Sequence, residues 1–303
     1  MRVNHEWNDY EIIATGEGLK LERWKNIHLL RPDPQVIWPS KFDMTSYPQL
    51  NAKYTRIGGG GAWTNLTKMP SSWTVSWRNL VFSIQPMGFK HTGLFPEQSV
   101  NWATMIDLIK KANRPIKVLN LFAYTGGATV ACTSAGAVVT HVDSAKNMVE
   151  KAKLNMKLSS LEEKPVRYIV DDCKKFVMRE IKRGNKYDAI IMDPPSYGRG
   201  PTGEVWKIED NIYELVLLCC KILTDKPLFF LINSYTTGLQ PTVMKNILYR
   251  ALNSVEENQN SNTKQKSKNH EKVSLKNIDC YEVGLPTKEN IDLPCGCSAI
   301  CIF

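Results

Sequence analysis

The sequence contains no apolar run that approaches the ~18 consecutive residues of a membrane-spanning helix, and its first residues lack the apolar core of a signal peptide. The eight cysteines show no zinc-binding spacing: Cys219 and Cys220 are adjacent, and the pair Cys295 and Cys297 has no counterpart elsewhere. We therefore expect reduced thiols, no metal ion, no membrane partner and a cytoplasmic location. The sequence gives no indication of the oligomeric state.

The composition is that of a globular protein with a basic surface. Of the 303 residues, 43% are hydrophobic and 23% are charged, which are ordinary values for a folded chain. The length is enough for one large α/β domain and a smaller one. The formal net charge of +9 at pH 7 favours a polyanionic partner, although a basic surface also serves solubility.

Residues 1–87 predict a small β-rich N-terminal domain. Short apolar and polar stretches alternate there, and residues 72–77 and 80–84 flank a two-residue turn as the strands of a hairpin. Six of the eight tryptophans lie in this part of the chain: Trp7, Trp24, Trp38, Trp63, Trp73 and Trp77. Tryptophan rings can stack on nucleic-acid bases, but they also fill the thin core of a small domain, and we favour the core for most of them.

Residues 88–303 predict a larger α/β domain. From about residue 99, apolar strands alternate with amphipathic helices, a pattern typical of a mainly parallel sheet with helices on both faces. Seven strands are expected, at residues 118–122, 138–142, 167–170, 189–192, 228–232, 281–284 and 298–303. Residues 256–272 are almost entirely Asn, Gln, Lys, Ser and Glu, so we predict a disordered insertion there.

The segment Asp193-Pro194-Pro195-Ser196-Tyr197 follows an apolar run at residues 187–192. Prolines end a strand because they donate no N–H and their φ is fixed, so the carboxylate is left at the sheet edge, where open α/β folds bind ligands. Asp193 and the Pro194 carbonyl can accept hydrogen bonds from an amino group, and Tyr197 can stack on a flat ring. The alternative is a solvated aspartate before a tight turn.

Polar groups also follow the three preceding strands. The first strand runs into residues 120–127, Asn-Leu-Phe-Ala-Tyr-Thr-Gly-Gly, whose glycines let a ligand approach the backbone closely, while the next helix offers free N–H groups to an anion. Asp143 ends the second strand and is suited to a ribose diol. Asp172 follows the third strand and can accept a hydrogen bond from an adenine amino group, with Asp171 as the alternative.

In this order the motifs resemble those of class I S-adenosylmethionine-dependent methyltransferases, and in particular the bacterial 23S ribosomal RNA methyltransferase group, whose glycine motif reads Asn-Leu-Phe-x-Tyr-Thr-Gly-Gly. Residues 88–98 and 198–207 also match segments of that group, whereas its N-terminal PUA domain is not evident here. The resemblance covers roughly residues 88–240. It implies a Rossmann-like methyltransferase fold with S-adenosylmethionine as the cofactor.

The resemblance also implies roles for single residues. The cofactor would be bound by the glycine segment, by the next two strand ends and by residues 95–98, through Tyr124, Thr125, Gly126, Gly127, Asp143, Ser144, Asp172, Cys173, Phe95, Glu97 and Gln98. Asp193, Pro194 and Tyr197 would be the catalytic residues that line the methyl-transfer site. Asn155 lies on the apolar face of its helix, so we expect it to tie a loop together and not to do chemistry.

One difference from that group, a missing cysteine, bears on whether a carbon or a nitrogen atom of the base is methylated. Members that methylate cytosine at C5 use a cysteine after the fifth strand as the nucleophile. Here that strand is followed by residues 233–237, Asn-Ser-Tyr-Thr-Thr, which include no cysteine. We therefore favour methylation of a base nitrogen, whose lone pair attacks the methyl group directly, over cytosine-C5 methylation of RNA.

The expected substrate is RNA, most simply ribosomal RNA. Arg199 and Lys207 follow the Asp-Pro-Pro segment and are suited to bind phosphates, and residues 174–186 carry six Lys or Arg against one Glu. The latter cluster is equally well explained as a solvated helix face. Two other functions stay open: an N-methyltransferase of a protein side chain or a small molecule, and a non-enzymatic RNA-binding protein that keeps the fold.

Overall fold

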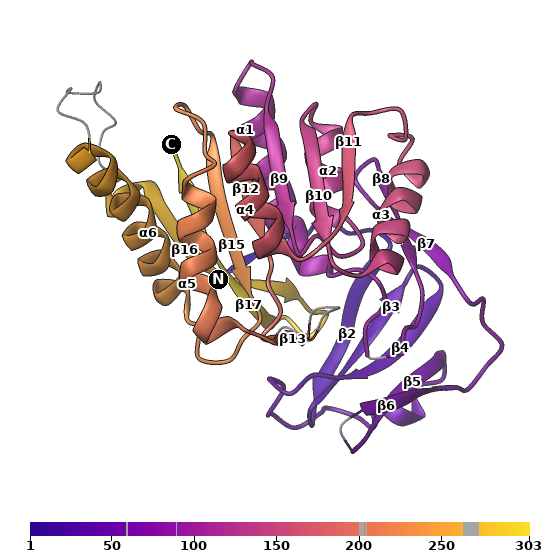
Figure 1. The fold of residues 1–303 in the computed structure, drawn as a ribbon. Helices are drawn as coiled ribbons and strands as arrows, with labels where there is room; N and C mark the ends of the chain where they lie inside the picture. The colour runs from indigo at the N-terminus through magenta and orange to yellow at the C-terminus, as the bar shows by residue number, and fades with distance from the viewer. Residues whose placement is uncertain (59, 89, 200–202, 204, 263–272) are drawn as a thin grey trace. The chain divides into compact units, whose positions relative to one another are not determined.

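The computed structural model describes residues 1–58, 60–88, 90–199, 203, 205–262 and 273–303 (Figure 1). The chain forms two compact units, and each combines segments that are distant in the sequence. The first unit comprises Met1–Asn101, Lys153–Glu162 and Val283–Cys295. The second comprises Trp102–Ala152, Glu163–Glu282 and Gly296–Phe303. The domain boundary that we expect from the sequence, between residues 87 and 88, stays a prediction.

The first unit contains a five-stranded sheet. Its strands, in the order in which they pair, are β2 (Tyr10–Gly16), β3 (Leu19–Trp24), β4 (Ile27–Pro32), β5 (Leu50–Ile57) and β6 (Gly60–Asn65). All neighbours are antiparallel except β4 and β5. Ala14, Leu21, Leu30 and Leu50 form a buried cluster with Met44 of the 3-10 helix η1 (Met44–Ser46). The β-rich character of the N-terminal part is confirmed.

The predicted hairpin forms a second, two-stranded sheet in this unit. Strands β7 (Trp73–Trp77) and β8 (Leu80–Ile84) pair antiparallel, and Arg78 in the turn has a positive φ of 52°. Two of the six tryptophans of this region, Trp24 and Trp77, are fully buried, and the other four are half-buried. Only two of the six tryptophans therefore lie wholly in the core, fewer than the majority that we expected.

The second unit contains the predicted parallel sheet. Its parallel strands, in spatial order, are β11 (Val166–Val170), β10 (Val138–Asp143), β9 (Lys117–Leu121), β12 (Ala189–Met192) and β15 (Phe229–Ser234). Strand β17 (Asp292–Ile302) pairs antiparallel with β15, and β16 (Ile278–Pro286) lies beyond it. The short strand β1 (Arg2–Val3) adds to the Val283 and Gly284 end of β16. The mainly parallel α/β sheet expected from the sequence is thus confirmed. Among the described residues it has eight strands, because β1 adds one to the seven that we expected.

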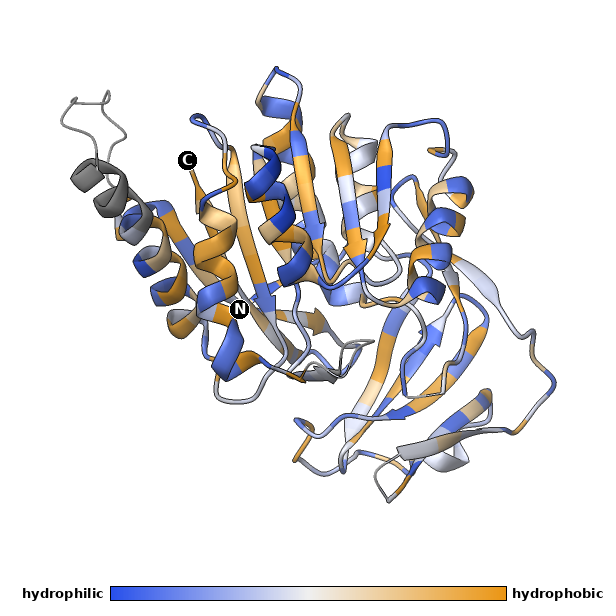
Figure 2. Cartoon of the chain, in the orientation of Figure 1, coloured by the Kyte–Doolittle hydropathy of each residue, from blue (hydrophilic) through white to orange (hydrophobic). Residues whose placement is uncertain are grey.

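Six α-helices are found among the described residues: α1 (Ser99–Lys111), α2 (Gly127–Ser134), α3 (Lys146–Leu158), α4 (Cys173–Arg183), α5 (Ile208–Cys220) and α6 (Pro241–Asn262). Helices α4, α5 and α6 lie side by side over one face of the sheet (Figure 1), where Leu119 and Leu121 join their apolar core. Successive side chains of a strand point to opposite faces, so Asn120 lies on the other face, and its amide donates to Thr129 of α2. The central strands are strongly hydrophobic (Figure 2).

Three further expectations concern Asn155, the predicted insertion at residues 256–272 and membrane-spanning helices. Asn155 is buried and accepts a hydrogen bond from the backbone N–H of Ser83 at 2.8 Å, so it ties α3 to β8, as expected of a structural amide. Helix α6 continues through Asn262 and therefore includes the first part of the predicted insertion. The rest of that insertion, residues 263–272, lies outside the described residues. No helix in the described part of the chain is long and apolar enough to cross a membrane.

Candidate functional site

Four strand ends meet at one edge of the parallel sheet. Strands β11, β10, β9 and β12 are consecutive parallel neighbours, so their C-terminal ends lie at the same edge. Asp172 follows β11, Asp143 is the last residue of β10, residues 122–127 follow β9, and Asp193 follows β12. Strand order reverses between β9 and β12, and open α/β sheets bind ligands at such a point.

The loop after β9 has an uncommon backbone conformation. Phe122 and Tyr124 have positive φ angles of 53° and 50°, and Gly126 has a φ of 80°. Residues other than glycine adopt this conformation rarely, at a cost of roughly 1 kcal/mol or more each, and such strain collects at functional sites. The strain therefore marks this loop as a candidate binding element independently of its sequence motif.

Neither glycine of the loop has room for a side chain. A Cβ atom on Gly126 would lie 2.8 Å from the Cβ of Ala152, and one on Gly127 would lie 2.6 Å from the ring of Trp102. Such distances are shorter than van der Waals contact, so both glycines are required for α2 to pack against its neighbours. The glycine pair thus serves the packing of the fold as well as the close approach of a ligand.

Asp143 anchors this loop to β10. Its Oδ2 accepts a hydrogen bond from the N–H of Tyr124 at 2.8 Å, and its Oδ1 accepts one from the N–H of Ala145 at 2.9 Å. Burial raises the pKa of Asp143, and the two backbone hydrogen bonds act in the opposite direction. Each carboxylate oxygen has a second lone pair, so Asp143 retains acceptors for hydroxyl groups of a ligand. The neighbouring Ser144 is exposed.

The two aspartates after β11 have structural partners. Asp172 accepts a backbone N–H of the first turn of α4 at 2.8 Å and so caps that helix with one oxygen. Both oxygens of Asp171 are engaged, one by the N–H of Asp172 and the other by the ion pair with Arg179. Cys173 is buried, which raises the pKa of its thiol, and its Sγ accepts the N–H of Phe122 at 3.3 Å. Asp172 therefore remains the better candidate for an adenine contact.

Asp193 is held by two residues that sequence analysis did not identify. Asn233, on β15, donates from Nδ2 to Oδ1 of Asp193 at 2.8 Å. Ser298, on β17, donates from Oγ to Oδ1 of Asn233, also at 2.8 Å, which fixes the direction in which the amide faces. Both residues are buried, at 1% and 0% exposure. This chain of hydrogen bonds keeps the carboxylate of Asp193 in one orientation at the strand end.

A small hairpin follows the Asp-Pro-Pro segment. Strand β13 (Tyr197–Arg199) pairs antiparallel with β14 (Val205–Lys207). Trp206 fixes the hairpin, because its Nε1 donates to the carbonyl of Pro195 at 2.7 Å and its ring lies 5.1 Å from the ring of Phe122. The hairpin is therefore attached both to the Asp-Pro-Pro turn and to the strained loop after β9.

The remaining predicted residues of this segment differ in exposure. Pro194 is buried, whereas Tyr197 is 52% exposed and is paired in the hairpin with the exposed Lys207. An exposed phenol ring and an exposed ammonium group thus lie side by side on neighbouring strands. Arg199 belongs to β13, but its side chain lies outside the described part of the structure.

Three predicted cofactor residues belong to the first unit. Phe95 precedes the short 3-10 helix η2 (Pro96–Gln98), and Glu97 and Gln98 are buried. The Oε1 of Gln98 accepts a hydrogen bond from the amide of Asn101 at 2.8 Å, which holds this turn against the start of α1. The role of these residues at a cofactor stays a prediction.

Cys297, on β17, lies beside the end of β15, although the residues that follow β15 in the sequence include no cysteine. It is paired with Ser234 across β15 and β17, is buried, and donates from Sγ to the carbonyl of Leu239 at 2.8 Å. Burial raises the pKa of this thiol to about 11, and the negative charges of Glu282 and Asp193 act in the same direction. A thiol that is protonated and hydrogen-bonded to a carbonyl is a poor nucleophile, so Cys297 does not supply the group that C5 chemistry needs.

A buried polar cluster supports the loop from inside the sheet. His141, on β10, is fully buried, and its Nδ1 is hydrogen-bonded to Oγ1 of Thr129 at 2.9 Å, which also accepts the amide of Asn120. Burial lowers the pKa of His141 to about 4, so the ring is neutral at pH 7. A Cβ on Gly126 would lie 3.6 Å from its Cε1, so the imidazole packs directly under the glycine loop.

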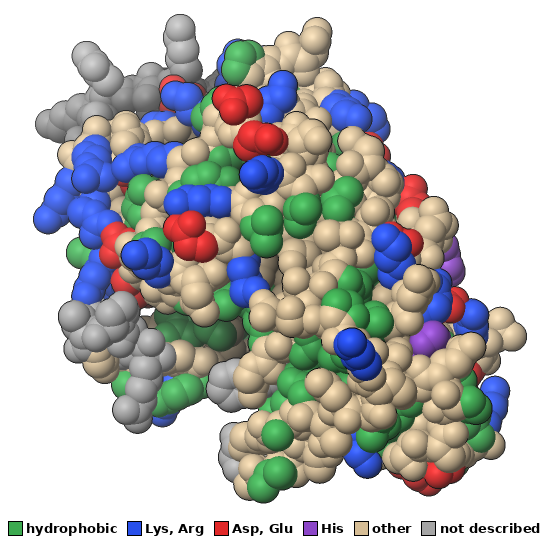
Figure 3. Space-filling view, turned by 90° about the vertical axis from the view of Figure 1, so that its right-hand side faces the viewer, with side chains coloured by type: hydrophobic (Ala, Val, Ile, Leu, Met, Phe, Trp, Pro, Cys, Tyr) green, Lys and Arg blue, Asp and Glu red, His purple; other side chains and the backbone are tan. Residues whose placement is uncertain are grey.

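The basic cluster at residues 174–186 is largely paired. Four of its basic side chains have partners: Lys174 with Glu214, Arg179 with Asp171, Arg183 with Glu180, and Lys186 with the carbonyl of Lys221. These pairs reduce the charge that the cluster offers to phosphates. On the face drawn in Figure 3, Lys and Arg side chains are interspersed with Asp and Glu. The cluster alone therefore does not identify an RNA-binding surface.

These observations define a class of protein. The sheet has its candidate site at the point where strand order reverses. Of the four neighbouring strands there, one is followed by a strained glycine loop and the other three by acidic groups, which is typical of α/β proteins that bind nucleoside-containing cofactors. Among the residues that the structure describes, no group of three His, Cys, Asp or Glu side chains is arranged to hold a metal ion.

The family follows from comparison with known sequences. The model of the S-adenosylmethionine-dependent methyltransferase family matches residues 53–224, which is more than half of the chain. The chain therefore belongs to this family, and S-adenosylmethionine is its cofactor. The site fits that molecule, because Asp143 and Asp172 present acceptors for its hydroxyl and amino groups at the ends of β10 and β11, next to the strand end that carries the glycine loop.

Individual relatives agree with this assignment. The crystal structure of the S-adenosylmethionine-dependent methyltransferase from Agrobacterium tumefaciens is 29% identical, with a TM-score of 0.86 over 99% of this chain and 92% of that one. Ribosomal RNA large subunit methyltransferase K/L of Colwellia psychrerythraea is 29% identical over 46% of this chain and 19% of its own length. Ribosomal RNA large subunit methyltransferase I of Klebsiella pneumoniae is 35% identical over 27% of this chain and 20% of its own. The chain thus spans about a fifth of these two relatives.

Proposed function

We propose that this protein transfers the methyl group of S-adenosylmethionine to a base nitrogen of RNA, with ribosomal RNA as the substrate and the cytoplasm as the place of action. The observation that carries the proposal is the carboxylate of Asp193, which Asn233 holds in one orientation after β12. Support for RNA comes from the relatives named ribosomal RNA large subunit methyltransferases and from the net charge of +9.

The residues of the Asp-Pro-Pro turn would orient the target. When bound, S-adenosylmethionine supplies a methyl group that its sulfonium makes electrophilic. The carboxylate of Asp193 and the carbonyl of Pro194 accept the N–H groups of a base and so fix the direction of the nitrogen lone pair, while the exposed ring of Tyr197 stacks on the base. Because that lone pair is the nucleophile, the protein contributes orientation and exclusion of water, and Asp193 need not be a strong base.

The other site residues would hold the cofactor and the RNA backbone. Asp143 would bind the ribose hydroxyls and Asp172 the adenine amino group. The remaining cofactor contacts are assigned to Tyr124, Thr125, Gly126, Gly127, Ser144, Cys173, Phe95, Glu97 and Gln98. Arg199 and Lys207, in the hairpin after Asp193, would bind phosphates of the RNA.

A nitrogen target is proposed in preference to cytosine C5 because of the state of Cys297. Attack on the cytosine ring needs a thiolate, and the thiol of Cys297 is buried, donates to a carbonyl and has a pKa of about 11. A nitrogen with an available lone pair needs no such nucleophile. The described geometry around Asp193, a hydrogen-bond acceptor without an activated thiol beside it, supports the simpler chemistry.

Mapping of methylated nucleosides tests the substrate. Ribosomal RNA from cells with and without the gene is digested and analysed by mass spectrometry, and RNA from both is also incubated with the purified protein and labelled cofactor. We expect one N-methylated base that is absent without the gene and is restored in vitro. Label in protein or small molecules but not in RNA would contradict the substrate, and 5-methylcytidine would contradict the nitrogen target.

Replacement of Asp193 tests the proposed methyl-transfer site. Asp193→Ala removes the acceptor that orients the base, so we expect kcat to fall roughly a hundredfold or more while the affinity for S-adenosylmethionine stays at the wild-type value. Calorimetry measures the affinity and transfer of labelled methyl to RNA measures kcat. Unchanged turnover would remove Asp193 from the mechanism.

A further inference from the structure

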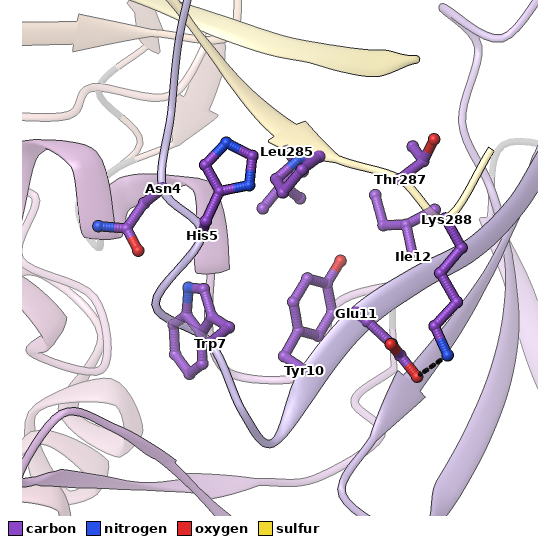
Figure 4. Close-up of a pocket in the computed structure, with 10 residues that line it drawn as sticks. Asn4, His5, Trp7, Tyr10, Glu11, Ile12, Leu285, Thr287 and Lys288 are labelled. Carbon is purple, nitrogen blue, oxygen red and sulfur yellow. Dashed lines mark ion pairs between the residues drawn. The ribbon is translucent and has the colours of Figure 1, made fainter. Parts of the chain in front are cut away.

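The first unit contains a pocket to which the proposed function assigns no role. It is lined by six residues between Asn4 and Ile12 and by residues 285–288, and it has a volume of about 180 Å³. Figure 4 shows the rings of His5, Trp7 and Tyr10 around an open space that Ile12 and Leu285 close on the other side. A pocket of this size suits one flat heterocycle, since sites for drug-sized ligands are roughly 300–1,000 Å³.

The polar atoms of the two larger rings are committed inside the protein. Trp7 donates from Nε1 to the carbonyl of Pro96 at 3.1 Å and to Oγ of Ser99 at 3.0 Å, and Tyr10 donates from its hydroxyl to Glu22 at 2.7 Å. The rings of Trp7 and Tyr10 are 6.0 Å apart at an angle of 72°, so they form a corner. Tyr10 is 3% exposed and Trp7 is half-buried, so what this corner offers a ligand is the ring surface of Trp7, and stacking on ring surface accepts any base.

The rim of the pocket carries an exposed cation. Lys288 is 59% exposed at its side chain and lies 2.9 Å from Glu11, the other charged residue of the lining. Arg23, outside the lining, lies 2.6 Å from the same carboxylate and shares its negative charge, so Glu11 neutralises Lys288 less completely. A cation beside an aromatic surface is the combination by which proteins bind single-stranded nucleic acid, because it meets both the phosphate and the base.

We propose that this pocket binds an unpaired base of the RNA substrate, stacked on Trp7 and His5, with the adjoining phosphate at Lys288. The inference rests on the proposed function, since it takes RNA as the substrate. Trp7 also contacts a segment to which we assign a cofactor role, because its Nε1 donates to the carbonyl of Pro96, which lies between Phe95 and Glu97. A base on Trp7 therefore contacts the side chain that holds this turn.

The test measures binding of a short single-stranded RNA oligonucleotide of mixed sequence to the full-length protein by fluorescence anisotropy at several salt concentrations. Trp7→Leu is expected to weaken binding roughly five- to 150-fold, and His5→Ala roughly fivefold, from the loss of stacking. Lys288→Gln is expected to reduce the slope of log K against log salt by roughly 0.7. Lys41→Gln is the matched control, because Lys41 is also an exposed lysine of this unit paired with a glutamate, Glu289 at 3.9 Å.

The outcomes separate the pocket from the proposed function. Trp7 contributes hydrogen bonds to the fold, so a loss of binding by Trp7→Leu counts only if its melting temperature is preserved, and the exposed His5 and Lys288 test the pocket without that complication. Wild-type affinity and salt slope in both His5→Ala and Lys288→Gln would overturn the pocket while RNA methylation stands. Absence of RNA binding by the wild-type protein, together with label transfer to another substrate, would overturn the proposed function and the pocket with it.

Discussion

At the scale of single residues, Asp193 depends on neighbours that are distant in the sequence. Its carboxylate accepts from Asn233, 40 residues away, and Asn233 is oriented by Ser298, a further 65 residues on. A hydrogen bond to a charged group contributes about 1.5–3 kcal/mol, and a buried network of this kind has one arrangement in which every member is satisfied. The prolines after Asp193 mark this acid in the sequence, whereas no local pattern marks Asn233 as the amide that holds it.

We expect Asn233→Ala to act on the methyl-transfer step and not on the cofactor. Loss of the donor frees the carboxylate of Asp193, so kcat should fall roughly ten- to a hundredfold with unchanged affinity for S-adenosylmethionine. Ser234→Ala is the matched control, because Ser234 is equally buried on the same strand but bonds the backbone N–H of Thr236. Equal loss of kcat in both variants, or loss of cofactor affinity in Asn233→Ala, would show a general effect on β15.

Cys297 provides a second prediction at this scale. If the target is nitrogen, Cys297→Ala should keep kcat within about twofold, since the thiol is protonated and serves only packing and the bond to Leu239. RNA that contains 5-fluorocytidine should form no covalent complex with the wild-type protein. A complex that survives denaturation, and disappears in Cys297→Ala, would restore cytosine C5 as the target.

At the scale of elements, the loop after β9 and helix α2 are packed without spare room. The φ of Gly126 is 80°, and its Cα faces the Cβ of Ala152 so closely that no side chain fits.

Strand β17 is longer than the sequence pattern predicts: it begins at Asp292, whereas we predicted a strand from residue 298. Pro294 and Gly296 are unfavourable in strands and concealed its start, but the pairing of β17 in the sheet and the burial of alternate residues outweigh them.

Two alanine substitutions separate backbone strain from packing at the two ends of α2. Gly126→Ala should destabilise the protein by about 2–4 kcal/mol and abolish cofactor binding, because it adds a clash with Ala152 to the strain of a positive φ. Gly136→Ala is the control: its φ is 96° and its Cβ would meet no atom within 4 Å, so the loss should be about 1 kcal/mol. Chemical denaturation and calorimetry measure both quantities, and equal losses would show that packing against Ala152 is unimportant.

At the scale of the whole molecule, one buried and one half-buried neutral histidine make stability depend on pH. Burial lowers the pKa of His141 to about 4, and burial together with the charges of Arg31 and Lys90 lowers the pKa of His91 to about 4. In the unfolded chain these rings take up a proton near their ordinary value of 6.5. Between these pH values the unfolded state binds more protons, so stability is complete above about pH 6.5 and falls as the pH decreases towards 4.

We expect His141→Gln to flatten this dependence. The free energy of unfolding of the wild type should decrease by about 3 kcal/mol on account of His141 between pH 6.5 and 4, and glutamine, which does not titrate, removes that contribution. Urea unfolding at several pH values measures the effect, and equal slopes for His141→Gln and the wild type would show that His141 does not titrate as its burial requires.

The sequence is sufficient to predict the alternation of strands and helices and the positions of Asp143, Asp172 and Asp193 at strand ends. These features are local: hydrophobic periodicity, a proline or a glycine leaves its mark within a few residues. Which groups contact these acids follows only from the tertiary structure: the side-chain amide of Asn233 at Asp193, and the backbone N–H of Tyr124 at Asp143. The same holds for Cys297, which lies beside the end of β15. Those contacts arise from the order and register of strands, and no local pattern in the chain encodes which strands become neighbours.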